Sequence, residues 1–279
     1  MGVDVTGFPT LQHAAAHCFA LRDPAGKIAA TLQAVEAFRA GDLPLAETTG
    51  WPAIPAVESV GRPERPNLVP PRQVASRGLG SDAGRAAFLH AIAHIEFNAV
   101  NLAWDAVLRF PGMPRGYYED WADCAHDEAR HFGLLADRLA HYNHAYGDFD
   151  AHDGLWEMAR KTAYSCLARM ALVPRVLEAR GLDVTPAMIE RVKASGDHDT
   201  VAVLEIILRE EVAHVAAGTR WFRWCCEREG VEPLPTFRNL LREHAKGALR
   251  GPFNVQARRE AGFDQDDMAM IEALALETP

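Results

Sequence analysis

The chain has 279 residues, of which 48% are apolar, and its 29 basic and 38 acidic side chains give a formal net charge of −9. This length suits one large or two small domains, and the apolar fraction is sufficient for a buried core, which excludes a disordered chain. The net charge disfavours binding to nucleic acid or to an anionic membrane.

The N-terminal region shows no basic segment followed by an apolar one, so we expect no secretion signal. No window approaches the roughly 18 uncharged apolar residues that a membrane span requires. The five cysteines form no C-x-x-C pair. We therefore expect a reduced, cytoplasmic protein.

The N-terminal part of the chain, up to Gly80, is predicted to form helices followed by an extended segment. Asp23 and Pro24 suit the N-cap and the first position of a helix that ends at Gly41. Seven of the 17 prolines fall in residues 42–80, here called the strap, which shows no helical or alternating period. We expect the strap to be extended and to pack along the rest of the protein. The apolar side chains available for this packing are Trp51, Ile54, Val57, Leu68 and Val69.

Four long helices are predicted in the centre of the chain. They cover about residues 81–110, 115–143, 155–180 and 197–229. Pro174 should kink the third helix, and a break over Gly181 to Pro186 should separate it from a short helix over 187–194. Each long helix would be about 40–50 Å long, as in a large four-helix bundle.

The predicted fold class is therefore all-α. We expect N-terminal helices and the strap in residues 1–80, a four-helix bundle in residues 81–230, and short C-terminal helices in residues 231–279.

Two of the four helices contain the motif Glu-x-x-His. Glu128 precedes His131 in the second helix, and Glu211 precedes His214 in the fourth. Residues three apart share one face of a helix, so each pair can direct both side chains at one point. The first and third helices each place a glutamate in an apolar stripe. These two glutamates are Glu96 and Glu178.

The spacing of these residues repeats along the chain. The two motif glutamates are separated by the same interval as their two histidines and as the preceding acids, Asp127 and Glu210. The interval between the two stripe glutamates is shorter by a single position. Such a set of one Glu from each of two helices and a Glu-x-x-His from each of two others is the ligand set of ferritin-like di-iron and di-manganese proteins.

The charges of this set match two divalent metal ions. Four carboxylates carry −4 and two divalent ions carry +4, so the buried set is neutral only when it is filled. Oxygen and imidazole ligands suit Fe(II) and Mn(II), and a ligand set without cysteine argues against structural zinc. We predict two metal ions per chain, iron first and manganese second. The predicted ligands are Glu96, Glu128, His131, Glu178, Glu211 and His214.

The first motif also carries a family resemblance. Residues 127–131, Asp-Glu-Ala-Arg-His, resemble the Asp-Glu-x-Arg-His signature of bacterial di-iron oxygenases in the ferritin-like superfamily. Residues 85–228 are similar to this superfamily, and residues 177–180 resemble the third-helix Glu-Ala-Arg of its tRNA hydroxylase branch. The whole chain is most similar to a bacterial family of ferritin-like proteins of unassigned activity. The second motif departs from the signature, because Ala213 replaces the arginine.

The resemblance implies a role for each residue. Glu128 and Glu211 would bridge or chelate both metals, the stripe glutamates would be terminal ligands, and each histidine would bind one metal. Asp127 and Glu210 would orient an imidazole N–H, as partners of metal-bound histidines generally do.

Several neighbouring residues are assigned other roles. His94 points away from the side of Glu96 and is expected to be an interface or surface histidine. Cys124, one turn before Glu128, is expected to be a small core residue rather than a wall of the metal pocket. Arg169 and Arg175 are expected to be surface charges.

The leading functional prediction is an oxidoreductase. A reduced metal pair can bind O₂ and supply two electrons, so that an organic substrate is oxidised or hydroxylated. An external electron donor would be needed, because no flavin or nicotinamide fingerprint occurs. The alternatives are a ferroxidase or iron-handling protein, and a metal-binding protein without catalysis. A homodimer is compatible with the sequence, and a nucleic-acid substrate ranks low.

Overall fold

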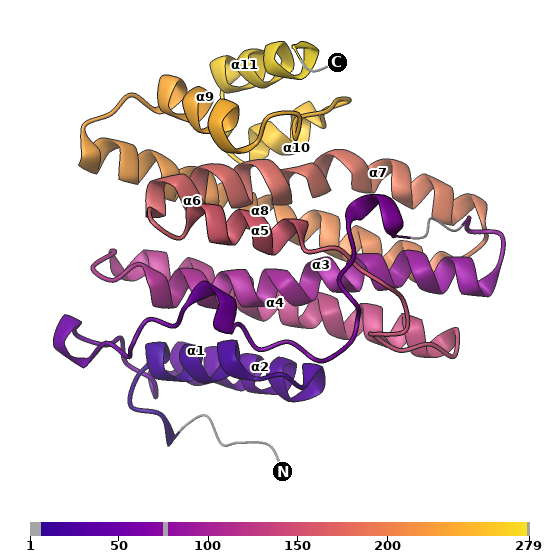
Figure 1. The fold of residues 1–279 in the computed structure, drawn as a ribbon, viewed down its shortest axis with the longest axis horizontal. Helices are drawn as coiled ribbons and strands as arrows, with labels where there is room; N and C mark the ends of the chain where they lie inside the picture. The colour runs from indigo at the N-terminus through magenta and orange to yellow at the C-terminus, as the bar shows by residue number, and fades with distance from the viewer. Residues whose placement is uncertain (1–6, 75–77, 278–279) are drawn as a thin grey trace. The chain divides into compact units, whose positions relative to one another are not determined.

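The computed structural model describes residues 7–74 and 78–277, shown in Figure 1. Every regular element in these ranges is helical, and the β contact there is an isolated bridge between Leu68 and Ala151. The predicted all-α class is confirmed. The chain forms two compact units, residues 1–156 (unit 1) and residues 157–279 (unit 2). Among the described helices, none has the length and apolar character that crossing a membrane demands.

Unit 1 is built around an antiparallel helix pair. Its helices are α1 (Leu11–Ala20), α2 (Pro24–Ala40), α3 (Asp82–Arg109) and α4 (Arg115–His141). The long helices α3 and α4 pack along each other, α1 packs on α3, and α2 packs on α4. A short turn joins α3 to α4, so the two run in opposite directions.

Local sequence signals set the ends of these helices. The Asp23 side chain accepts a hydrogen bond from the Gly26 N–H, and Gly41 ends α2 with a φ of 88°, which suits a residue without Cβ. Ser81 caps α3 in the same way as Asp23 caps α2. The buried face of α2 includes Lys27, whose ammonium donates to the Phe19 carbonyl and to the Asn101 side chain.

The described residues of the strap lie against the helices of unit 1 and form the purple segment between α2 and α3 in Figure 1. It contains the short 3-10 turns η2 (Thr48–Gly50), η3 (Val57–Ser59) and η4 (Pro71–Gln73). The Trp51 indole N–H donates to the Leu108 carbonyl of α3 at 2.9 Å, and the Trp156 indole N–H donates to the Val57 carbonyl at 3.1 Å.

Two of the strap side chains expected to be buried are exposed. Ile54 and Leu68 are each 44% exposed, whereas Val57 is 7% exposed. The strap is attached through hydrogen bonds of its backbone and of indole rings and through the ion pair of Arg62 with Asp153, and the Val69 N–H donates to the Ala151 carbonyl. The neighbouring Leu68 side chain is therefore free to point outward, because backbone pairing holds the chain at this point.

Unit 2 is built around a second helix pair. The elements are α6 (Cys166–Leu172), the π-helical segment η5 (Val173–Glu178), α7 (Ala179–Ala194) and α8 (His198–Glu229). The helix α5 (Gly154–Thr162) precedes them, and α6, η5 and α7 all pack on α8. The C-terminal helices are α9 (Pro233–His244), α10 (Val255–Glu260) and α11 (Gln265–Leu276).

The prediction of one helix over residues 155–180 is wrong. The helix stops at Thr162 and restarts at α6, where the Ser165 side chain caps the new helix. Arg169, expected at the surface, is 1% exposed and fills this break. Its Nε donates to the Thr162 hydroxyl and its Nη2 to the Ala159 carbonyl, both at 2.7 Å. The second bond satisfies a backbone carbonyl that a continuous helix would have used.

The predicted break over Gly181 to Pro186 is also wrong, because α7 runs through it. Pro186 lacks the N–H that would bond to the Leu182 carbonyl. That carbonyl instead accepts a hydrogen bond from the Asn254 side chain at 3.1 Å. The proline is tolerated because a distant residue satisfies the group that it leaves open. Pro174 does disturb the helix as expected, through the wider turn of η5.

Candidate metal centre

Three of the predicted ligands lie together in unit 1. Glu96 stands as far before the end of α3 as Glu128 stands after the start of α4, so the antiparallel pair brings them to one level. The Nδ1 of His131 is 3.3 Å from a Glu96 oxygen and 3.6 Å from a Glu128 oxygen. One ligand atom of each residue lies within 4.8 Å of the others. All three are buried, with exposed fractions of 3% for Glu96 and 0% for the other two.

The raised pKa values of two of these groups are compatible with a cation site. Burial, together with the charge of Glu128, raises the pKa of Glu96 from 4.5 to about 8. Burial alone would lower the pKa of His131, but hydrogen bonds and charges from Glu128 and Glu96 raise it to about 11. At neutral pH Glu96 and His131 therefore hold protons, which offset the negative charge of the three side chains. A divalent metal ion would supply this positive charge instead and displace the protons.

The other three predicted ligands are buried in unit 2. Glu211 and His214 lie one turn apart on α8, with a Glu211 oxygen 3.7 Å from the His214 Nδ1. Glu178 is the last residue of η5, which packs on α8. The exposed fractions are 9% for Glu178, 9% for Glu211 and 3% for His214. Each unit thus carries a buried Glu and a buried Glu-x-x-His pair.

The acids before the motifs are less buried than the predicted ligands. Asp127 has a side chain that is 27% exposed, and one of its oxygens accepts a hydrogen bond from Arg130 at 3.1 Å. In the second motif Ala213 takes the place of that arginine, and Arg209 lies 3.5 Å from a Glu210 oxygen. Orientation of an imidazole by Asp127 or Glu210 stays a prediction.

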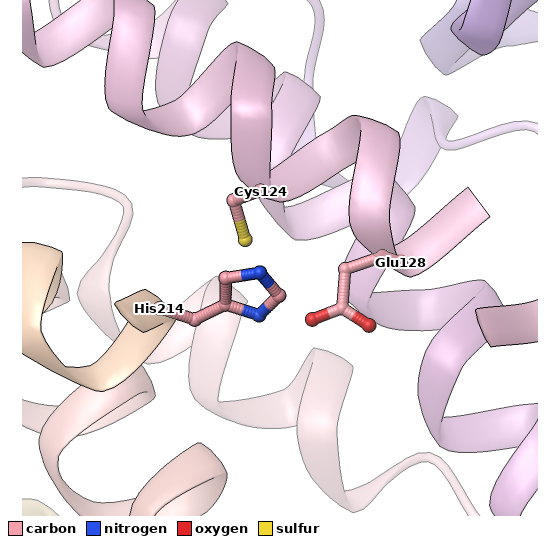
Figure 2. Close-up of side chains that lie close together, drawn as sticks. All are labelled: Cys124, Glu128 and His214. Atoms are coloured by element: carbon pink, nitrogen blue, oxygen red, sulfur yellow. The ribbon is translucent and has the colours of Figure 1, made fainter. Parts of the chain in front are cut away.

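Cys124 is a further candidate ligand in unit 1. Figure 2 shows Cys124 and Glu128 on the same side of α4, and their ligand atoms lie within 4.8 Å of each other. The thiol is buried, with 2% of the residue exposed. Its four-residue spacing from Glu128 was a signal in the sequence, but that spacing is equally typical of a core residue. Figure 2 also draws His214, which belongs to α8 of unit 2.

His94 lies away from these ligands, as the sequence predicted, but it is buried rather than at the surface. Its Nε2 donates to the His152 carbonyl at 3.1 Å, so in the neutral ring its Nδ1 accepts from the Tyr146 hydroxyl at 2.9 Å. With Tyr146 and strap residues between Arg62 and Leu68 it lines a pocket of about 390 Å³. Both ring nitrogens are engaged in these bonds, so His94 is not available as a ligand.

These observations define a class: an all-helical protein whose two units each bury a glutamate and a Glu-x-x-His pair. The buried carboxylates and imidazole of unit 1 lie close enough together to hold a metal ion. The chain belongs to the family described as "Protein of unknown function (DUF455)", whose profile matches residues 20–269. It is 44% identical over 216 residues to an uncharacterized protein of Haemophilus influenzae, and the match covers 75% of each chain. No solved structure matches the chain.

Proposed function

We propose that this protein is a carboxylate-bridged di-iron or iron–manganese oxidoreductase of the ferritin-like superfamily. It would use O₂ to oxidise or hydroxylate an organic substrate. The proposal joins the ligands of the two units into one set for two metal ions. These ligands are Glu96, Glu128, His131, Glu178, Glu211 and His214.

The observation that carries the proposal is the repetition of one buried ligand pattern in both units. A single buried glutamate is usually explained by an ion pair, but the chain buries a Glu and a Glu-x-x-His twice, at nearly the same sequence spacing. In unit 1 Glu96 and His131 hold extra protons in place of a cation. Oxygen and imidazole donors in this ratio suit Fe(II) and Mn(II), and six side chains shared by two ions leave coordination positions for O₂ and substrate.

The residues of the chain would bind the metal ions and exclude water from them. Glu96 and His131 would lose their extra protons as metal binds, and the carboxylates of Glu96 and Glu128 would hold the ions by charge. The buried surroundings of the set would keep bulk water from the reacting groups. When bound, the reduced metal pair would supply two electrons to O₂. An external electron donor would then return the metals to the reduced state.

Anaerobic titration with Fe(II), followed by addition of O₂, tests the proposal. The protein should bind two Fe(II) per chain and then consume O₂ in proportion to an added reductant. Glu128→Ala should remove most of the bound iron. Glu119→Ala is the matched control, because Glu119 lies on the same helix with its side chain 47% exposed and paired to Arg115. This control should bind iron as the wild type does.

Two outcomes would contradict the proposal. Binding of one zinc per chain that is unaffected by Glu128→Ala would exclude the di-metal set. Ferric mineral forming at many irons per chain would instead indicate an iron-handling protein.

A further inference from the structure

Arg175 carries a charge that is buried inside unit 2, although the sequence suggested a surface position. Its guanidinium carbon lies 4.6, 4.0 and 4.7 Å from the ring centroids of Phe222, Phe237 and Phe263. Its Nη2 is 2.8 Å from an oxygen of Asp267, and its side chain is 0% exposed. A buried ion pair is costly to desolvate and adds little net stability compared with apolar side chains. The role of this ion pair therefore lies in the arrangement of the two segments that it joins.

Arg175 lies in η5, three residues before Glu178. Pro174, which has no N–H, is accommodated in the wide π turn of this segment. The same turn lies so close to α8 that a Cβ atom at Gly218 would overlap the Pro174 ring. The segment that ends at Glu178 is thus in tight contact with α8 and is tied to α11 through Asp267.

Residues 254–267, here called the C-terminal clamp, hold the following turns of α7 as well. Arg258, 1% exposed, makes a two-pronged ion pair with Asp183 at 2.9 and 2.7 Å. The side chain of Asn254 donates to the Leu182 carbonyl, which Pro186 leaves open. The clamp therefore contacts the chain on both sides of Glu178. Asp267 pairs with Arg175 before it, and Arg258 donates to the Ala179 carbonyl after it.

We propose that Asp267 is a positioning residue for Glu178. By pairing with Arg175 it fixes the π turn of η5 and so the direction in which Glu178 presents its carboxylate. Without the charge of Asp267, the Arg175 charge is no longer compensated at this contact, and η5 must rearrange to bring the guanidinium toward water. The inference rests on the proposed function, since it takes Glu178 as a metal ligand.

The test compares Asp267→Asn with Asp264→Asn in the full-length chain. Asparagine at 267 keeps the shape and the acceptor for the Asp264 N–H but removes the charge. Asp264 caps α11 and pairs with the partly exposed Arg223 at 2.9 Å, and asparagine is an equally good N-cap, so this control keeps the helix start. Both proteins are titrated with Co(II) under anaerobic conditions. Bound Co(II) is followed by its visible absorption, and folding by circular dichroism at the same temperature.

Asp267→Asn should weaken Co(II) binding at one of the two positions by about 10–100-fold. Substitutions of residues that hold a metal ligand in place generally have effects of this size. It should also alter the Co(II) spectrum while the helical signal is kept. Asp264→Asn should give the wild-type affinity and spectrum. A folded Asp267→Asn protein with wild-type affinity and spectrum overturns the inference.

Glu178→Gln separates this inference from the proposed function. If Glu178→Gln weakens Co(II) binding and Asp267→Asn does not, only the positioning role fails. If Glu178→Gln also leaves binding unchanged, the proposed ligand set and the inference fail together.

A double variant decides the case if Asp267→Asn alone does not fold. Arg175→Met combined with Asp267→Asn removes both charges, and a thioether packs well among aromatic rings, so this protein should fold. It should bind Co(II) as weakly as Glu178→Gln. Binding at the wild-type level overturns the inference.

Discussion

Acid should destabilise unit 1 through His94, and the size of the effect follows from its surroundings. The ring is 6% exposed and stacks on Tyr146 with an interplanar angle of 24°. Burial lowers the pKa of His94 from 6.5 to about 4. His90, which stacks on the same tyrosine, has its pKa shifted in the same direction for the same reason.

The direction in which stability changes with pH follows from proton binding. Between pH 6.5 and 4 the unfolded chain takes up a proton at His94 that the folded chain does not, so stability is present above pH 6.5 and is lost as pH falls toward 4. Integrating this difference from pH 7.5 to pH 5 gives a loss of about 2 kcal/mol for this one histidine.

Urea unfolding at pH 7.5 and pH 5, with metal removed by a chelator, measures the effect. His94→Gln removes the titration, so its loss of unfolding free energy between the two pH values should be about 2 kcal/mol smaller than that of the wild type. Glutamine has a carbon where histidine has Nδ1, so the bond to the Tyr146 hydroxyl is lost and the variant should be less stable at pH 7.5. His141→Gln is the control, since His141 is exposed at the end of α4. An equal pH dependence in His94→Gln and the wild type would refute the reasoning.

Three further predictions concern the metal ligands and the strap. Metal-loaded protein should contain two metal ions per chain by elemental analysis, and a constant value of one would contradict the ligand set. Glu211→Ala should lower occupancy at both metal positions, whereas Glu210→Ala should weaken binding about 10–100-fold. If Glu210→Ala instead emptied the site and Glu211→Ala had no effect, the motif of α8 would be displaced by one residue. A protease specific for glutamate should cut slowly after Glu58, because the Trp156 indole N–H holds the adjacent Val57 carbonyl at 3.1 Å. Rapid cleavage there, with the rest of the chain intact, would show that the strap is a loose tether.

The helix ends could be predicted because the signals that set them are local. Asp23 and Gly41 act within one turn of their own helix, and the structure has both where the sequence placed them. The path of the chain around Pro186 could not be predicted in this way. Whether a proline breaks a helix depends on where the freed carbonyl finds a donor, and here the donor is Asn254, far along the chain.

The candidate ligands could be found because their pattern is a property of the sequence. A three-residue spacing on a helix, repeated at a fixed distance, needs no tertiary information. The burial of Arg175 could not be found, because its aromatic surroundings come from three separate segments of unit 2. Cys124 was visible as a neighbour of Glu128, but only the packed structure shows its thiol buried beside that carboxylate.

The buried charges of the two units are compensated in different ways, and this difference separates structural ion pairs from a candidate metal site. Arg175 and Arg258 each face an aspartate at 2.8 and 2.7 Å, so their charges are balanced by the chain itself. In unit 1 the trio of Glu96, Glu128 and His131 instead relies on bound protons, as the raised pKa values of the first and the last indicate. Protons are exchangeable with solvent and a divalent ion can replace them, whereas an arginine cannot leave. The trio is therefore the place in unit 1 where binding of a metal ion would relieve the electrostatic cost of folding rather than add to it.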